Sequence, residues 1–278
     1  MGARHKKGTG TQGAGIEGLG PGACVLKAVN TAEVMGVVDH SSLNAFASQD
    51  DIKRLIDEAI ELSTHSVCIE PIHAQFAREY IASRKAGVKV NIVLDFPLGA
   101  LTTSARLGLL KSFSEVADEV DFVTQIGYLK SGRFDLIERD LQLLAREAHD
   151  NGILVKIITE DAYSTLSEKK KLYGIVCKSG VDFIKTTTGF DTSPSSANYA
   201  GSLGNSTGAR PENVRLMAGI ADALNPDIGI KVAGGIRTLE QALSLNEASE
   251  RPFDPKKFRL GISGTRAIYN ELISTHAA

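Results

Sequence analysis

The stretch Val181-Asp182-Phe183-Ile184-Lys185-Thr186-Thr187-Thr188-Gly189-Phe190 joins an apolar strand to a loop rich in threonine and glycine, with a lysine at the junction. An ammonium group in a buried strand is unfavourable by several kcal/mol unless it is paired with an opposite charge or loses its proton. Burial, or a second cation nearby, favours the neutral amine, which can attack a carbonyl carbon and form a Schiff base. Lys185 is therefore a candidate nucleophile.

The same arrangement, a short apolar run followed by an amphipathic stretch, recurs along the chain from about residue 30. This alternation is the pattern of βα units around a parallel sheet. Eight strands are predicted, at residues 35–39, 66–70, 89–95, 119–126, 154–159, 181–185, 229–232 and 259–262. Eight helices are predicted to follow them, at residues 49–63, 72–86, 102–117, 133–150, 166–179, 211–224, 238–249 and 265–275. Because no linker interrupts the units and no GxGxxG motif follows the first strand, a closed (β/α)8 TIM barrel of the α/β class is favoured over an open doubly wound sheet.

Local signals support these boundaries. Ser48 stands where a helix N-cap is needed, and Pro211 stands in a first helical turn. Gly87, Gly152 and Gly180 each lie between a helix and the next strand, where a glycine commonly ends a helix.

The length and charge of the chain indicate its class of partner. Its 278 residues suit one α/β barrel domain, since such barrels commonly run to about 250 residues. The net charge is −2 and the two signs are interspersed, so no surface field is expected to recruit nucleic acid or an anionic membrane. No stretch approaches the roughly 20 apolar residues of a membrane span. We therefore expect a small-molecule partner.

The amino terminus is basic and then rich in glycine, without the apolar segment of a secretory signal. Residues 1–23 are predicted to be a flexible tail, and residues 24–278 the barrel domain. Three widely separated cysteines, with no CxxC pair, indicate neither a disulfide framework nor a zinc ribbon. The six histidines are scattered, so no metal and no other cofactor is expected. These features fit a cytoplasmic location.

Charged residues occur on four consecutive predicted strands: Asp121, Lys156, Lys185 and Lys231. Neighbouring parallel strands lie about 4.8 Å apart, so these side chains can converge on one pocket. There Lys231 would favour the neutral form of Lys185, while Asp121 would hold the other cation or move a proton. Lys156 fits a structural ion pair as well as a functional role, and Asp121 also fits a cap or a salt bridge.

Glycine-rich turns follow the last two predicted strands. Gly234, Gly235 and Arg237 follow the seventh, and Gly261 and Ser263 follow the eighth. Glycine lets backbone N–H groups approach an anion, and these positions in a barrel commonly bind phosphate. The turns therefore predict a phosphate site, with tight turns alone as the alternative. Arg237 fits a phosphate ligand or a surface ion pair.

Two further segments belong to the expected catalytic face. Asp39, at the end of the first predicted strand, fits a residue that orients a substrate hydroxyl, or a cap of the next helix. Residues 186–210 connect strand six to its helix, where such loops usually take about 2–6 residues. The segment is polar and contains several glycines. It is predicted to be a lid over the substrate or a disordered surface insertion.

A barrel with a Schiff-base lysine and no metal is typical of a class I aldolase. The chain also carries an ordered series of motifs: Val38-Asp39-His40-Ser41-Ser42-Leu43, Val67-Cys68-Ile69, Phe96-Pro97-Leu98-Gly99, Asp118-Glu119-Val120-Asp121, Val155-Lys156-Ile157-Ile158, the lysine stretch quoted above, and Lys231-Val232-Ala233-Gly234-Gly235-Ile236-Arg237-Thr238. In these motifs it resembles the deoxyribose-phosphate aldolase family, over about residues 34–270.

The resemblance implies reversible cleavage of 2-deoxy-D-ribose 5-phosphate to acetaldehyde and D-glyceraldehyde 3-phosphate. It implies that Lys185 forms the Schiff base, that Lys231 perturbs the pKa of Lys185, and that Asp121 works with Lys231 and water in proton transfer. Asp39 and Lys156 match positions that support these groups and contact substrate hydroxyls. The residues predicted to bind the substrate on its phosphate side are Thr188, Gly189, Gly234, Gly235, Arg237, Gly261 and Ser263.

Some positions depart from the family pattern. Asp95 precedes Phe-Pro where the family usually has a small residue, and Glu70 follows Val-Cys-Ile where a neutral residue is common. The last glycine turn reads Gly-Ile-Ser-Gly-Thr in place of a double serine. Two alternatives therefore stay open: a related class I aldolase for another phosphorylated sugar, and a non-catalytic barrel that binds sugar phosphates. A homo-oligomer is also compatible with the sequence.

Overall fold

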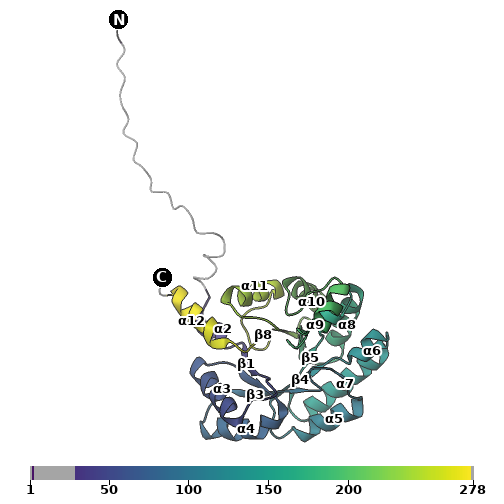
Figure 1. Cartoon of the computed structure of the whole chain (residues 1–278), viewed down its shortest axis with the longest axis horizontal. Coiled ribbons are helices and arrows are strands. Elements are labelled where there is room, and N and C mark those ends of the chain that lie inside the picture. The colour runs from purple at the N-terminus through teal and green to yellow at the C-terminus, as the bar shows by residue number, and fades with distance from the viewer. Residues whose placement is uncertain (1, 3–28, 277–278) are drawn as a thin grey trace.

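The computed structural model describes residue 2 and residues 29–276, and its strands form a closed parallel barrel in the order β1 to β8 (Figure 1). The strands are β1 (Val38–Ser42), β2 (Ser66–Ile69), β3 (Lys89–Leu94), β4 (Glu119–Val123), β5 (Leu154–Ile158), β6 (Phe183–Lys185), β7 (Gly229–Ala233) and β8 (Phe258–Ile262). The predicted (β/α)8 TIM barrel is confirmed. The tail predicted for residues 1–23 lies, apart from Gly2, outside the described residues.

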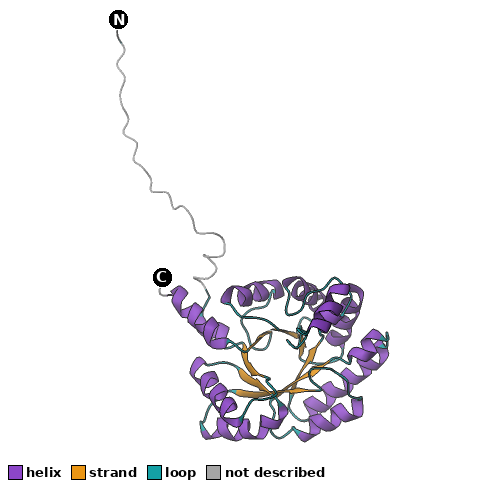
Figure 2. Cartoon of the chain, in the orientation of Figure 1, coloured by secondary structure: helices purple, strands orange, loops and turns teal. Residues whose placement is uncertain are grey.

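The barrel is surrounded by helices (Figure 2). Those that follow the strands are α3 (Gln49–Leu62), α4 (Ala74–Ser83), α5 (Thr103–Ser112), α7 (Phe134–Asp150), α8 (Leu166–Lys178), α10 (Pro211–Leu224), α11 (Leu239–Ser249) and α12 (Thr265–His276). Shorter elements are α2 (Thr31–Met35), α6 (Ile126–Lys130), α9 (Pro194–Ser202) and the 3₁₀ turns η1 (Pro71–His73) and η2 (Asp161–Tyr163).

Alternation along the strands separates an apolar layer from a charged barrel interior. Side chains such as Val120, Phe122 and Ile157 belong to the hydrophobic core that also contains the buried faces of the helices. The residues between them, Asp121 and Lys156, are completely buried as well but point to the other face of the sheet. The interior of this barrel is therefore a place where charges must be paired.

Several helix boundaries follow the sequence signals, although α4 and α5 end earlier than predicted, at Ser83 and Ser112. Ser48 caps α3 in a reciprocal capping box, as predicted. Gly152 and Gly180 adopt positive φ angles of 69° and 85° after α7 and α8. The left-handed position after α4 is taken by Lys85, at φ 53°, so the prediction that Gly87 serves there is wrong.

The first predicted strand begins too early. Met35 ends helix α2, whose first turn is capped by the Asn30 side chain, and β1 begins only at Val38. Val34 and Met35 are buried in the helix, so their apolar character reflects core packing and not a strand. Strand β4 likewise ends at Val123, because helix α6 starts at Ile126.

The long connection at residues 186–210 is not unstructured. Helix α9 lies within it, with Ser193 as its N-cap and Pro194 in its first turn. The buried Asp191 carboxylate accepts a hydrogen bond of 2.9 Å from the backbone N–H of Gly208, so the two ends of the segment are joined. The alternative of a disordered insertion is therefore wrong, whereas the predicted lid motion is untested.

Asp95, the departure before Phe-Pro, has a structural role. Its carboxylate lies 3.2 Å from the guanidinium of Arg106, which is completely buried. Arg106 also donates to the Val123 carbonyl at 2.9 Å and lies 3.4 Å from the Asp140 carboxylate. A buried guanidinium needs such partners, so Asp95 ties the end of β3 to helix α5.

Candidate active site

The register of the sheet brings the predicted charged residues together. Asp121 is paired with Lys156 across β4 and β5, and Lys185 is paired with Lys231 across β6 and β7. All four residues are at most 2% exposed. The convergence predicted from four consecutive strands is thus present in the structure.

Asp121 is the centre of the lysine cluster. Its Oδ2 lies 2.7 Å from Lys185 Nζ and 2.8 Å from Lys231 Nζ. Its Oδ1 lies 3.2 Å from Lys156 Nζ. One carboxylate therefore contacts three amines.

Asp39 forms the second anchor of the cluster. Its Oδ2 lies 2.6 Å from Lys231 Nζ, and its Oδ1 accepts from Arg259 Nη1 and Ser66 Oγ, both at 2.8 Å. Asp39 is fully buried beneath the barrel opening, so its contacts here are with protein groups.

A deeper layer, which the sequence analysis did not identify, contains Glu119 and Arg259. Glu119 Oε2 accepts from Lys156 Nζ at 2.6 Å, and Glu119 Oε1 accepts from Arg259 Nη2 at 3.0 Å and lies 3.1 Å from His65 Nε2. Lys156 also donates to the side-chain oxygen of Asn91 at 3.1 Å. This layer fixes Lys156 and Asp39 from below. In this structure Lys156 is a structural partner of the site.

The charges of this interior cluster are unequal in number. It holds four basic groups (Lys156, Lys185, Lys231 and Arg259) and three carboxylates (Asp39, Glu119 and Asp121). If one base is neutral, the buried charges balance, which lowers the desolvation penalty.

Lys185 is the base that can lose its proton with the fewest lost ion pairs. Lys231 contacts two carboxylates, Asp39 and Asp121, and Lys156 and Arg259 each contact two as well. Among the described residues, Lys185 contacts the carboxylate of Asp121 alone. Lys185 is therefore held by the fewest ion pairs of the four basic groups, as suits the expected nucleophile.

Asp121 and Lys231 are held in their charged forms. Burial by itself would raise the pKa of Asp121, but the three lysines that contact it, Lys156, Lys185 and Lys231, together hold that pKa far below its ordinary value. Burial would lower the pKa of Lys231, and the carboxylates of Asp121 and Asp39 outweigh it and raise that pKa well above its ordinary value. Lys231 is thus a persistent cation beside Lys185.

A cavity of about 390 Å³ opens above Lys185 at the carboxyl ends of the strands. Lys185 lines it, whereas Asp39, Asp121, Lys156 and Lys231 lie beneath it. The predicted phosphate-side residues also line it: Thr188, Gly189, Gly234, Gly235, Arg237, Gly261 and Ser263. The cavity therefore joins the candidate nucleophile to both glycine-rich turns.

Two of these glycines are required by geometry. Gly234 has φ 101°, and a Cβ there would lie 2.7 Å from Thr187 Oγ1. A Cβ on Gly261 would lie 2.9 Å from the Cβ of Ala233 and 3.4 Å from Cε of Lys231. Gly261 thus makes room for the Lys231 side chain inside the barrel, besides lining the cavity.

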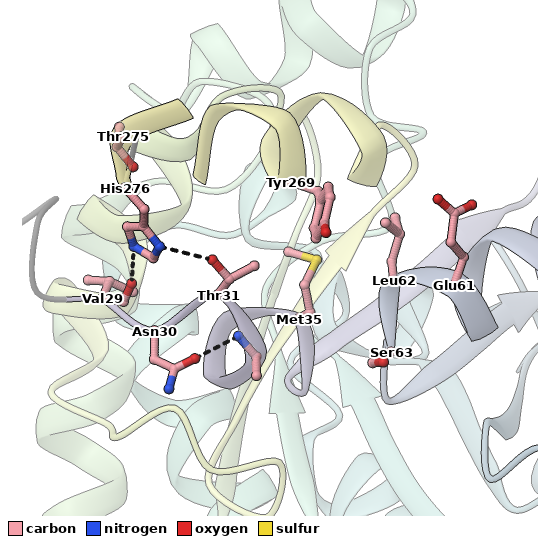
Figure 3. Close-up of a pocket in the computed structure, with 11 residues that line it drawn as sticks. Val29, Asn30, Thr31, Met35, Glu61, Leu62, Ser63, Tyr269, Thr275 and His276 are labelled. Carbon is pink, nitrogen blue, oxygen red and sulfur yellow. Dashed lines mark hydrogen bonds between the residues drawn. The ribbon is translucent and has the colours of Figure 1, made fainter. Parts of the chain in front are cut away.

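A larger cavity, of about 830 Å³, lies beside helices α2 and α12 and the end of α3 (Figure 3). There His276 Nε2 lies 2.8 Å from the Val29 carbonyl oxygen, beside Met35 and Tyr269. Helix α2 and the end of α3 come just before β1 and β2, and the last residues of α12 line the cavity too, so it is at the opposite end of the barrel from Lys185. It contains none of the predicted site residues.

No helix among the described residues is both long and apolar enough to cross a membrane. No group of three or more histidine, cysteine, aspartate or glutamate side chains in residues 29–276 is placed to hold a metal ion.

A parallel eight-stranded barrel whose cavity ends on a buried lysine, beside glycine-rich turns, is the architecture of a lysine-dependent barrel enzyme. The family model that matches residues 34–271 is described as DeoC/LacD family aldolase. The chain belongs to the DeoC/LacD aldolase family, and it is an aldolase.

Named relatives agree with this assignment. The chain is 48% identical over 239 residues to a deoxyribose-phosphate aldolase of Thermoplasma volcanium, a match that covers 86% of this chain and 94% of the relative. It is 40% identical over 217 residues to the deoxyribose-phosphate aldolase of Thermococcus gammatolerans, covering 78% and 89% of the two chains.

Solved structures share the fold. A structure titled QR15, an aldolase, matches with a TM-score of 0.71 and 30% identity over 88% of this chain and 97% of that one. The deoxyribose phosphate aldolase of Aeropyrum pernix, described as a unique tetrameric structure, matches with a TM-score of 0.74 and 22% identity over 91% and 96% of the two chains.

Proposed function

We propose that this aldolase reversibly cleaves 2-deoxy-D-ribose 5-phosphate to acetaldehyde and D-glyceraldehyde 3-phosphate through a Schiff base on Lys185. The named relatives supply the substrate. The observation that carries the proposal is the position of Lys185, at the floor of the cavity and on a carboxylate shared with two further lysines. A related aldolase for another phosphorylated sugar would use the same lysine, and a non-catalytic sugar-phosphate-binding barrel would not need it.

The proposed reaction begins with attack of the neutral Lys185 amine on the C1 aldehyde of the open-chain sugar. Protonation of the hydroxyl group of the resulting carbinolamine, followed by loss of water, gives an iminium ion. Removal of the C3 hydroxyl proton then breaks the C2–C3 bond, because the electron pair moves to the iminium and leaves an enamine. The fragment that contains carbons 3 to 5 departs as glyceraldehyde 3-phosphate. Protonation of the enamine at C2, followed by hydrolysis, releases acetaldehyde and restores the amine.

The charged groups below the cavity are assigned to proton transfer and electrostatics. Asp121 and Lys231 move protons to and from the substrate through water, as the sequence analysis predicts. Lys231 stays cationic and disfavours a second charge on Lys185. Lys156 and Asp39 are assigned to holding this arrangement. We do not assign them direct contact with substrate hydroxyls, because they lie beneath the cavity.

The substrate phosphate is assigned to the glycine-rich side of the cavity. Gly234 and Gly235 follow β7, and Ser263 stands just before the first turn of α12. Backbone N–H groups in such turns, and the positive end of a helix dipole, favour an anion. Arg237 is exposed at the rim and is assigned to the same phosphate.

Borohydride reduction in the presence of acetaldehyde tests this proposal. Reduction of the Schiff base should fix a two-carbon group on Lys185, found by peptide mass mapping, and should inactivate the enzyme. A Lys185→Arg variant, which keeps a long basic side chain but loses the nucleophilic amine, is the matched control and should take up no adduct. An adduct on another lysine, or cleavage of deoxyribose 5-phosphate by that variant, would contradict the assignment.

The connection at residues 191–207 supplies a separate prediction. If it closes over the substrate, its replacement by a short Gly-Ser link should raise KM for the phosphorylated sugar and change kcat, because a closed cavity excludes water and orients the substrate. The slow reaction of unphosphorylated 2-deoxyribose should change less. Steady-state kinetics with both sugars measure the difference. Unchanged constants for both would leave α9 without a catalytic role.

The remaining expectations concern the protein in the cell. The tetramer described for the Aeropyrum pernix aldolase supports a homo-oligomer here too, and light scattering gives the mass. The flexible tail and the cytoplasmic location stay predictions.

A further inference from the structure

Three buried carboxyl groups lie beside the phosphate-side part of the cavity, and the proposed reaction uses none of them. They belong to Glu160, Asp161 and Asp191, each at most 1% exposed. Glu160 has φ 49°, a left-handed conformation that non-glycine residues rarely adopt unless surrounding contacts hold them there. The hydrogen bonds that Glu160 makes in the buried cluster are therefore expected to hold it in this conformation.

The carboxyl group of Glu160 holds Thr188, one of the residues that line the cavity. The backbone N–H of Thr188 donates to both carboxyl oxygens, at 3.3 and 3.4 Å, and its hydroxyl forms a short hydrogen bond with Oε2. The same hydroxyl accepts from the N–H of Phe190 at 3.0 Å. A hydroxyl has one proton to give. If that proton points to Glu160, it is not available to a ligand in the cavity.

Positive charge is scarce around this acidic cluster. Within residues 29–276, no lysine or arginine nitrogen forms an ion pair with Glu160. Lys169, the cation close to Asp161, donates to the side-chain oxygens of Asn205 and Asn213 at 2.7 and 3.0 Å. Tyr163 is the other titratable neighbour. Glu160 thus faces two acids and a phenol, with no cation to hold its charge.

Burial first, and then the charges of Asp191 and Asp161, raise the pKa of Glu160 to about 7, although its hydrogen bonds with Thr188 oppose the shift. Glu160 is therefore poised to change its protonation state near neutral pH. A phosphate dianion in the adjacent cavity would add a further negative charge and favour the protonated acid still more.

We propose that Glu160 is a positioning residue for the phosphate: it takes up a proton when the phosphorylated substrate binds, and it thereby turns the Thr188 hydroxyl toward the substrate. The proton comes from solvent. The new O–H of Glu160 donates to Thr188 Oγ1, whose own proton is then free to be donated to a phosphate oxygen. This inference rests on the proposed function, because it takes the phosphate to lie beside Thr188.

The sign of the pH dependence follows from linkage. Below about pH 7 Glu160 is already protonated in the free enzyme, so binding needs no proton and KM is independent of this group. Above it, binding requires proton uptake, and KM rises by up to about tenfold per pH unit. Cleavage of unphosphorylated 2-deoxyribose lacks this dependence.

The experiment compares Glu160→Gln with the wild type at about pH 6 and about pH 8.5, on either side of the Glu160 pKa. The amide donates to Thr188 as the protonated acid would, but it does not titrate. We expect similar KM values at the lower pH and, at the higher pH, a wild-type KM about tenfold above that of the variant, with kcat within about twofold. The substrate phosphate ionises near pH 6, which affects both enzymes equally.

Glu240→Gln is the matched control, because it removes the charge of an exposed glutamate on α11 that makes no contact with Thr188. The KM of this variant should depend on pH as that of the wild type does. A Glu160→Gln variant whose KM rises with pH as the wild type does would overturn the inference. Failure of the wild type to cleave deoxyribose 5-phosphate at either pH would instead overturn the proposed function.

A second measurement covers the case in which Glu160→Gln does not fold. Sulfate, a dianion that takes no proton in this range, is titrated into the wild-type enzyme at about pH 8, above the Glu160 pKa, by calorimetry in buffers with different ionisation enthalpies. Binding with uptake of a proton is expected. Binding without a dependence on the buffer would overturn the inference, as would sulfate that binds without competing with deoxyribose 5-phosphate.

Discussion

Replacement of Lys185 by alanine should lower kcat for cleavage of 2-deoxyribose 5-phosphate by on the order of 10⁴-fold or more, as expected when the nucleophile of a covalent mechanism is lost. Among the described residues, the other two lysines that contact Asp121 are Lys156 and Lys231, and both lie beneath the cavity. Neither can therefore replace Lys185 as the nucleophile. Circular dichroism checks that the variant is folded. A coupled assay for glyceraldehyde 3-phosphate measures cleavage.

Two comparisons make this result specific. Lys178→Ala, at the exposed end of α8, changes an equal number of atoms far from the cavity and should keep wild-type kinetics. Lys185→Arg should be as inactive as Lys185→Ala, since it also lacks the nucleophilic amine. If either Lys185 variant retained a tenth or so of wild-type kcat, the covalent role would be wrong.

Replacement of Lys231 by leucine should lower kcat by about 10²-fold or more near neutral pH. The variant keeps three basic groups, Lys156, Lys185 and Arg259, and three carboxylates. Their charges cancel when Lys185 is protonated, so we expect Lys185 to keep its proton. The nucleophile is then in the wrong form, and activity should reappear only at more alkaline pH. A pH profile of kcat measures the shift.

The length of the side chain must be separated from its charge. Lys231→Met keeps an unbranched chain in the space that Gly261 leaves open, and it should show the same alkaline shift as Lys231→Leu. If the methionine variant had normal kcat and an unchanged pH profile, the proposed coupling between Lys231 and Lys185 would be refuted. Loss of activity at every pH in both variants would assign Lys231 to proton transfer alone.

Much of the fold could be predicted, because each βα unit carries its own signals. The apolar runs of β2 to β8 and the helix starts at Ser48 and Pro211 depend on local chemistry. Helix α9 was missed because Ser, Asn and Gly are weak helix formers, and only Ser193 and Pro194 mark its start. Its stability depends on long-range contacts such as the hydrogen bond between Tyr163 and Ser196.

The site was predicted less completely. Asp121 and the three lysines could be found, because a charge within an apolar strand is conspicuous. Glu119 and Arg259 stand at the beginning of strands, where charge normally faces solvent, and only barrel closure brings them together. Glu160 follows β5 in a segment that resembles an ordinary polar turn. Its importance depends on Thr188, 28 residues away, and no local pattern reveals that contact.

The charged residues inside the barrel also affect how its stability depends on temperature. Most barrels stack branched apolar side chains inside, whereas this one buries a layer that joins Glu119, Arg259, Lys156 and Asp39. Hydration of ions becomes less favourable as temperature rises, so the penalty for burying such a layer falls on heating. This interior therefore favours the folded barrel more at high temperature than at low temperature. The same charges that prepare the lysine for reaction also suit the enzyme to warm conditions.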